Sequence, residues 1–333
     1  MSRKNIFLRD PWKHVDNDDS GWGNRLICWQ TACIINNAMG NTHTIKVLPE
    51  EFPELTLVNF PNTEYTTLEE IKAIPIQDLE VQKWIENEKI ELDNKVSYTN
   101  KFSYGNTLDL SEKFFDLNTD IFTSIELKNK TLYSKIKNLV KNRIGIHIRR
   151  GNGVYVDWYD INTVPSRYRK YYKIDNTADK VYAFIRDEIY FKVIDEYLAN
   201  NIETKFYLGI DVNVKALTYY KEKYPNKILT CNDVINLNKD LLDELKFLEP
   251  RLQLKNMGYN LIDFFSLSCT KEIVHSPPST WSYTASRISG KNNNFKKSEM
   301  TEGKIQDEYN NLNYANHNNN GYKKQYILKS NII

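Results

Sequence analysis

Apolar and polar positions follow two different periods along the second half of the chain. Short, nearly continuous apolar runs predict buried strands at 143–149, 204–211, 227–231 and 272–276. Apolar residues that recur every three or four positions predict helices at 131–142, 179–201, 212–225, 261–270 and 279–289. Because strands alternate with helices, we expect a parallel sheet with helices on both of its faces.

The beginning of the chain repeats this pattern once. Residues 5–9 read as a strand, and the apolar periodicity of 24–40 predicts a helix that Gly40 would end. A second strand is predicted at 43–49. Strand, glycine-containing loop, helix and strand form a βαβ unit. Within residues 50–130, the segment TTLEEIKAIPIQDLEVQKWIENEKIEL is charged and reads as partly helical, KFSYGNTLDLSEKFFDLNTDIF is irregular, and no strand is predicted.

Composition limits the possible functions. The 333 residues are 41% apolar and carry a net charge of only +2, so the chain can bury a core, and a general nucleic-acid binder is disfavoured. Its four cysteines have neither zinc-site nor disulfide-framework spacing, which favours a reducing compartment. No signal-peptide core and no apolar run of ~18 residues occurs, so we expect a cytoplasmic protein without a membrane span.

Two arginines follow the strand of the segment RIGIHIRRGNG. In a parallel sheet, ligands bind beyond the carboxyl ends of the strands, where Arg149 and Arg150 are predicted to lie. The planar guanidinium fork matches phosphate oxygens, and Gly151 and Gly153 would let backbone approach a ligand. The alternative is that both arginines are solvated or pair with acidic side chains.

A second anion site is suggested by the segment HSPPSTWSY. Ser279, Thr280 and Ser282 lie at the start of a predicted helix, where free N–H groups and the helix dipole attract anions. An ordinary N-cap by Ser276 or Ser279 is the alternative interpretation.

A third such turn is SGWGNRL, in which two glycines precede a helix that begins with Asn24 and Arg25. It lacks the third glycine of the dinucleotide-binding fingerprint, and the chain contains no P-loop motif. Three turns that could each bind an anion together favour a phosphorylated ligand.

These motifs, in this order, resemble those of the fucosyltransferase superfamily of α-1,2-, α-1,6- and protein O-fucosyltransferases. GIHIRRGN is similar to its H-x-R-R motif, and FYLGIDVNVKALTYYKEKYPNKI to the strand–Asp–helix segment that follows it. LIDFFSLSCTKEIVHSPPSTWSYTAS is similar to the final segment of the family, and GWGNRL to its N-terminal glycine loop. The resemblance covers about 20–40 and 140–290.

The resemblance implies an α/β, GT-B-like fold with two facing Rossmann-like domains, each built on a parallel sheet. Residues 1–140 would form the acceptor-side domain, with an irregular insert at about 50–130. Residues 141–290 would bind the nucleotide sugar. The Asn- and Lys-rich tail at 291–333 would be loosely packed or would return to the N-terminal domain.

The resemblance also implies a metal-independent, inverting transfer of L-fucose from GDP-β-L-fucose to a hydroxyl of an oligosaccharide or glycoconjugate. No cofactor and no nucleic-acid partner is expected. Arg149 would bind the β-phosphate, because without a metal an arginine must balance the charge of the departing GDP. His147 would lie at the guanine or ribose, and the Asp263 carboxylate would accept hydrogen bonds from guanine. The remaining expected donor-binding residues are Arg150, Ser279, Thr280, Ser282, Asn24, Arg25 and Asp211.

The general base is expected to be Asp157, which matches the carboxylate suspected in the α-1,6 enzymes; a solvated loop aspartate is the alternative. Asn152 stands where the family usually has Asp, so any role of that acid is lost or moved. Trp281 and Tyr283 fit the α-1,2 members better, which leaves the linkage open. Two alternative functions remain: a transferase that uses another GDP-sugar, and a member that binds a nucleotide sugar or glycan without turnover.

Overall fold

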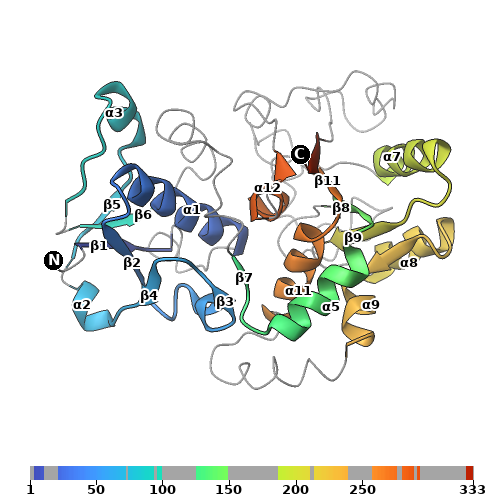
Figure 1. Cartoon of the computed structure of the whole chain (residues 1–333), viewed down its shortest axis with the longest axis horizontal. Coiled ribbons are helices and arrows are strands. Elements are labelled where there is room, and N and C mark those ends of the chain that lie inside the picture. Colours follow the sequence, from blue (N-terminus) through green and yellow to red (C-terminus); the bar gives the residue numbers. More distant parts are fainter. Residues whose placement is uncertain are drawn as a thin grey trace, which may run out of the picture.

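The protein is described by a computed structural model with two α/β regions side by side, each built on its own sheet (Figure 1). The residues that it describes are 4–10, 22–72, 74–93, 96–99, 125–148, 187–210, 214–238, 257–275, 280–288, 291–292 and 328–332.

A five-stranded parallel sheet forms the core of the N-terminal region. Its strands are β1 (Lys4–Leu8), β2 (His43–Val47), β4 (Thr63–Tyr65), β5 (Ile76–Asp78) and β6 (Ser97–Thr99). They lie in the order β4-β2-β1-β6-β5, and every neighbouring pair is parallel. The predicted βαβ unit at the start of the chain is confirmed.

Helix α1 (Trp22–Ala38) connects β1 to β2 and packs against both strands. It begins two residues before the predicted start, and most of its residues are buried because it lies between the two regions of the molecule. Gly40 follows the helix with a φ of 73°, a left-handed conformation that ends helices and that glycine adopts without strain. The predicted end of this helix is therefore confirmed.

Residues 50–130, for which no strand was predicted, contribute three of the five strands of this sheet, so the expectation of an irregular insert there is wrong for its described part. Strands of three residues are too short to show an alternating pattern. The other elements of this stretch are η1 (Pro53–Thr56), β3 (Val58–Asn59), α2 (Leu68–Lys72), α3 (Val81–Glu86) and β7 (Glu126–Leu127), of which β3 and β7 form an antiparallel pair.

The C-terminal region is built on a six-stranded mixed sheet. Its strands are β8 (Ile144–Ile148), β9 (Phe206–Ile210), β10 (Ile228–Thr230), β11 (Glu272–His275), β12 (Lys291–Asn292) and β13 (Leu328–Ile332). The order is β10-β9-β8-β11-β13-β12. The first four are parallel to one another, whereas β13 runs antiparallel to both of its neighbours.

Strand β13 corrects one expectation for the tail. It pairs with β11 of the C-terminal sheet, so the described part of the tail does not return to the N-terminal region. The contact is made by backbone hydrogen bonds between antiparallel strands, which impose little on the side chains, and so the sequence LKSNI gave no sign of it.

The predicted helices and strands of this half of the chain are confirmed, with ends that shift by a few residues; residues 179–186 of one predicted helix lie outside the described residues. The helices are α5 (Lys130–Val140), α7 (Asp187–Asn200), α8 (Val214–Lys223), α9 (Cys231–Asn236), α11 (Met257–Ser268) and α12 (Thr280–Ile288).

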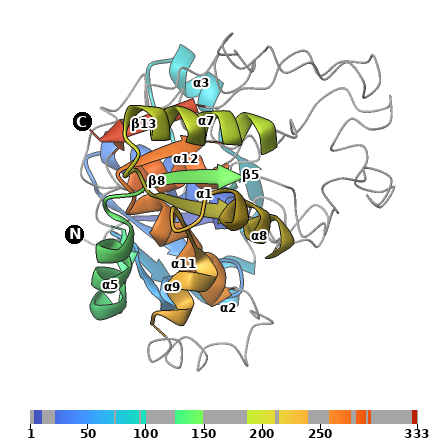
Figure 2. The same cartoon turned by 90° about the vertical axis from the view of Figure 1, so that its right-hand side faces the viewer.

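The two faces of the C-terminal sheet differ in character. Ile144, Ile146 and Ile148 of β8 point to one face, where they join a hydrophobic cluster with residues of α7. Gly145 and His147 alternate with them and face α11, as expected from the period of two in a strand. Figure 2 shows β8 between α7 and α11.

Glycines allow α11 to lie close against the sheet. A Cβ atom on Gly145 would come within 2.6 Å of Thr270 Oγ1 and 2.9 Å of Leu267 Cδ1. A Cβ atom on Gly209, in the next strand, would lie 3.4 Å from an oxygen of Asp263. Larger side chains at these positions would push α11 away from the sheet.

The two regions share one hydrophobic core. A single cluster of buried side chains runs from Ile6 and Ile45 of the N-terminal sheet to Phe264 of α11 and Ile273 of β11. Helix α12 packs against α11 and against α1 and so joins the regions (Figure 1). The predicted α/β class with parallel sheets is confirmed, whereas the predicted domain boundary between residues 140 and 141 stays a prediction.

Candidate functional site

Three neighbouring parallel strands, β9, β8 and β11, end at the same edge of the C-terminal sheet. Their last residues are Ile210, Ile148 and His275. Ligands of α/β proteins bind at such an edge, beyond the carboxyl ends of the strands. The predicted site residues Arg149 and Asp211 directly follow two of these strands in the sequence.

His147 is the penultimate residue of β8 and is 2% exposed. Its register partner in β9 is Gly209, and its side chain is on the α11 face of the sheet because it alternates with Ile146 and Ile148. A buried imidazole next to a strand end is suited to hydrogen-bonding a ligand that reaches this edge.

Asp263 of α11 lies on the same face of the sheet as His147 and reaches Gly209, the register partner of His147. Its carboxylate lies against Gly209 and is 5% exposed. The Tyr207 hydroxyl donates a hydrogen bond of 2.6 Å to Asp263 Oδ1. The structure thus brings together His147 and Asp263, two predicted site residues that are far apart in the sequence, around Gly209.

Tyr207 is protonated and neutral, and in this form it donates the hydrogen bond that holds the Asp263 carboxylate. Burial raises the pKa of the Tyr207 hydroxyl well above its ordinary value, and the neighbouring carboxylate of Asp263 raises it further. The phenol therefore keeps its proton at any ordinary pH. Sequence reasoning missed Tyr207, although the alternation in FYLGI places it on the same side of its strand as Gly209.

The start of α12 forms another part of this edge. The helix begins at Thr280, five residues after His275, the last residue of β11, and Ser282 lies in its first turn. Ser282 is fully buried, and among the described residues its hydroxyl has no hydrogen-bond partner. A buried hydroxyl beside free N–H groups at a helix N-terminus can donate to an anion.

The predicted site residue Arg25 pairs with carboxylates of the N-terminal region. Its guanidinium forms an ion pair with Glu54, and its Nη1 lies 3.8 Å from Asp10 Oδ2. These carboxylates belong to the N-terminal region, and they balance the charge of Arg25. Next to them, Arg9 Nη2 and Glu51 Oε1 pair at 2.7 Å. Asn24 lies beside Arg25 in the first turn of α1. Contact of Arg25 or Asn24 with a donor stays a prediction.

Burial raises the pKa of the Glu54 carboxyl, and the ion pair with Arg25 opposes this rise without cancelling it. The first turn of α1 is thus fixed by a buried charge cluster at the carboxyl end of β1, which we define as Arg9, Asp10, Arg25, Glu51 and Glu54.

Several predicted site residues lie outside the described residues: Arg149, Arg150, Asp157, Asp211 and Ser279. Thr280 is the first residue of α12, and nothing is described of its side chain. Their roles therefore stay predictions.

Within the described ranges, no group of three or more His, Cys, Asp or Glu side chains could hold a metal ion. No helix in the described part of the chain has the length and apolar character needed to cross a membrane.

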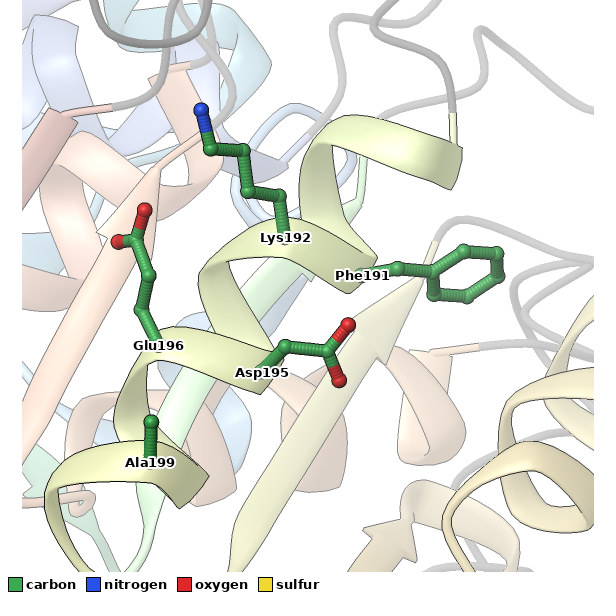
Figure 3. Close-up of a pocket in the computed structure, with 5 residues that line it drawn as sticks. All are labelled: Phe191, Lys192, Asp195, Glu196 and Ala199. Carbon is green, nitrogen blue, oxygen red and sulfur yellow. The ribbon is translucent and has the colours of Figure 1, made fainter.

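A shallow pocket lies on α7, on the sheet face opposite to α11 (Figure 3). Its lining residues are Phe191, Lys192, Asp195, Glu196 and Ala199. The Tyr224 hydroxyl donates to Asp195 Oδ1 at 2.9 Å, and Lys223 Nζ lies 4.9 Å from the centre of the Phe191 ring. These contacts join α7 to α8. They fit a structural role, and the pocket does not belong to the edge that holds His147 and Asp263.

Comparison with models of protein families and with curated proteins finds no match. Among solved structures, the chain is similar to the fucosyltransferase NodZ from Bradyrhizobium, with 12% identity and a TM-score of 0.45 over 86% of this chain and 93% of that chain. NodZ alpha-1,6-fucosyltransferase co-crystallized with GDP matches with 12% identity and a TM-score of 0.46 over 86% of this chain and 92% of that chain.

A mutant of Arabidopsis thaliana FUT1 in complex with GDP matches with 12% identity and a TM-score of 0.45, over 87% of this chain and 69% of that chain. A likeness of this size does not decide what this chain does. The NodZ structures are named as fucosyltransferases.

Proposed function

We propose that this chain is a glycosyltransferase that moves L-fucose from GDP-β-L-fucose to a hydroxyl of an oligosaccharide or glycoconjugate. The observation that carries the proposal is the meeting of His147 and Asp263 beside Gly209, at the sheet edge from which the H-x-R-R segment leaves. GDP is suited to a carboxylate that accepts from guanine and to cations and N–H donors for its phosphates. Asp263 and the start of α12 lie at this edge, and Arg149 and Arg150 directly follow β8 in the sequence.

Recognition of guanine is assigned to Asp263. Guanine presents two adjacent donors, N1–H and N2–H₂, and a carboxylate is the side chain that accepts from both. Adenine and uracil lack this pair of donors, so the contact would select GDP. The hydrogen bond from Tyr207 fixes the orientation of the carboxylate before the ligand arrives.

Binding of the diphosphate is assigned to Arg149, Arg150 and the start of α12 with Ser282. Negative charge grows on the β-phosphate as the bond to fucose breaks, and a fixed guanidinium stabilises this charge most in the transition state. Arg149 therefore carries the catalytic effect that a metal ion supplies in other transferases. Asp157 is proposed as the base that takes the proton of the acceptor hydroxyl while that oxygen attacks with inversion.

The first test is a calorimetric titration with GDP, GDP-fucose, ADP and UDP in the presence of EDTA. Binding of GDP and GDP-fucose, with weak or no binding of ADP and UDP, is the expected result. Absence of binding for all four would contradict the proposal. A transfer assay that offers GDP-fucose and other GDP-sugars then decides which sugar is used, and failure to transfer any sugar would favour a binding protein without turnover.

Arg149→Lys tests the catalytic assignment. The variant keeps the positive charge but loses the planar fork, and we expect kcat to fall about 10²- to 10³-fold, as when one transition-state donor is removed. Arg143→Lys is the matched control, because Arg143 lies at the opposite end of β8 and bonds to the carbonyl oxygens of Leu139 and Phe206. An unchanged kcat in Arg149→Lys, measured with donor at saturation, would remove Arg149 from the mechanism.

A further inference from the structure

Trp22 lies where the two regions of the molecule meet. Its indole is edge-to-face with Phe60 of the N-terminal region at 5.9 Å between ring centres, and with Phe264 of α11 at 5.6 Å. The side chain is 5% exposed. Trp22 is thus a buried aromatic contact between the N-terminal region and the helix that carries Asp263.

Phe264 directly follows Asp263 in the sequence, and it is held on more than one side. Besides Trp22, it packs edge-to-face against Trp281 of α12, at 5.4 Å and an interplanar angle of 89°. Phe264 is fully buried. Because the two residues share one turn of α11, a shift of the Phe264 ring moves the backbone that carries the Asp263 carboxylate.

The other end of this contact is fixed as well. Arg25, three residues after Trp22 in the first turn of α1, is tied to Glu54 and Asp10 by the buried charge cluster. Phe60 also packs against Trp29 of the same helix, at 5.1 Å. The start of α1 is therefore joined to the N-terminal region by several contacts. Because Trp22 packs against Phe264, the position of Trp22 affects the position of α11.

We propose that Trp22 is a positioning residue that sets the Asp263 carboxylate for the guanine base, so that selection of GDP depends on the N-terminal region. This inference rests on the proposed function. Trp22 acts through Phe264 and needs no contact with the ligand. It makes the first turn of α1, in the region without the nucleotide edge, a determinant of nucleotide specificity.

Trp22→Phe is the test, because it keeps an aromatic ring of smaller size. An edge-to-face aromatic pair is worth enough to change an equilibrium about 2- to 12-fold, so we expect GDP to bind about 3- to 10-fold more weakly. Binding of ADP should not change, since it does not use the carboxylate in this way. In the transfer assay, KM for GDP-fucose should rise while kcat stays the same, as for a contact made equally in the ground and transition states.

Trp84→Phe is the matched control. Trp84 is also a buried tryptophan of the N-terminal region, 2% exposed and edge-to-face with Tyr98 at 6.5 Å, but it lies in α3, which is far from α11 (Figure 1). This variant should lose a similar amount of packing and bind GDP as the wild type does. Equal weakening of GDP binding in both variants would mean a general loss of packing and would overturn the inference.

Phe264→Leu and the double variant with Trp22→Phe complete the experiment. If Trp22 acts through Phe264, the effects of the two substitutions on GDP affinity should not add. Additive effects, or unchanged GDP affinity in a folded Trp22→Phe protein, would overturn the inference and leave the proposed function intact. Failure of the wild type to bind GDP would overturn the proposed function, and the inference with it. Should Trp22→Phe not fold, Phe60→Leu, which removes the partner of Trp22 in the N-terminal region, is compared with the Trp84→Phe control, and unchanged GDP affinity in Phe60→Leu would overturn the inference.

Discussion

At the scale of single residues, the ion pair of Arg25 and Glu54 is the contact whose loss should most directly lower the stability of the folded protein. Both side chains are largely buried, and each is the principal partner that balances the charge of the other. A buried ion pair costs much desolvation, yet removal of one partner costs more, because a charge is then left without compensation.

Arg25→Met should therefore destabilise the protein by about 3 kcal/mol at neutral pH. In the variant the pKa of Glu54 should rise further, because burial already raises it and the opposing guanidinium is gone. When the pKa of a carboxyl is higher in the folded protein than in the unfolded chain, its ionisation destabilises the folded protein. The protein therefore loses stability as the pH rises from the unfolded pKa, about 4.3, to the folded pKa. The loss should thus be smaller at pH 5 than at pH 8.

Urea unfolding at both pH values measures this effect. Lys46→Met is the control, because Lys46 pairs with Glu64, whose side chain is 57% exposed. That variant should lose less than about 1 kcal/mol at either pH, as exposed ion pairs do. An equal loss at pH 5 and pH 8 in Arg25→Met would show that Glu54 does not carry the effect.

At this scale, the sequence predicted the strand that holds His147 and the helix that holds Asp263, whereas the roles of both residues stay predictions. His147 could be placed because its strand was clear, and Asp263 because its helix and the resemblance agreed. Tyr207 and the partners of Arg25 could not be predicted. Their contacts join segments that are distant in the sequence, and a tyrosine in a strand has the same pattern whether it packs or donates a hydrogen bond.

At the scale of elements, the close approach of α11 to β8 and β9 determines where the carboxylate of the site lies. Gly145→Ala should destabilise the protein by about 1–3 kcal/mol, because its Cβ would come within 3 Å of Thr270 and Leu267, and overpacking has this cost. Gly209→Ala is the matched variant and should cost less, since its nearest neighbour would be 3.4 Å away. Thermal or urea unfolding of both proteins checks the order, and an equal cost would mean that α11 adjusts freely.

The apolar pattern decides which elements the sequence predicts. Strands β8, β9 and β11 form nearly continuous apolar runs and were predicted, whereas helix α9 and the five-residue strand β13 were not. Strands β4, β5 and β6 have three residues each and were not. A run of three residues holds too few positions to separate a period of 2 from a period of 3.6, so their pairing is decided by tertiary contacts.

At the scale of the whole molecule, the shared core predicts one cooperative unfolding transition. The cluster that contains Ile6 of one sheet and Ile273 of the other is continuous, so neither region can expose its part without disturbing the other. Differential scanning calorimetry should give a single transition whose calorimetric and van't Hoff enthalpies agree. Two resolved transitions would mean that the contacts of α1 with α11 and α12 contribute little to stability.

The same continuous core limits how the molecule can admit a substrate. Two domains joined by a flexible linker can separate by a hinge rotation. Here a large hinge rotation would expose Trp22, Phe264 and their neighbours to water. Packed helices can slide past one another by small distances while they stay in contact, the kind of motion known as shear. We therefore expect the two regions to adjust to a bound ligand by such small sliding of α12 along α1, which keeps Trp22 and Phe264 covered, rather than by moving apart.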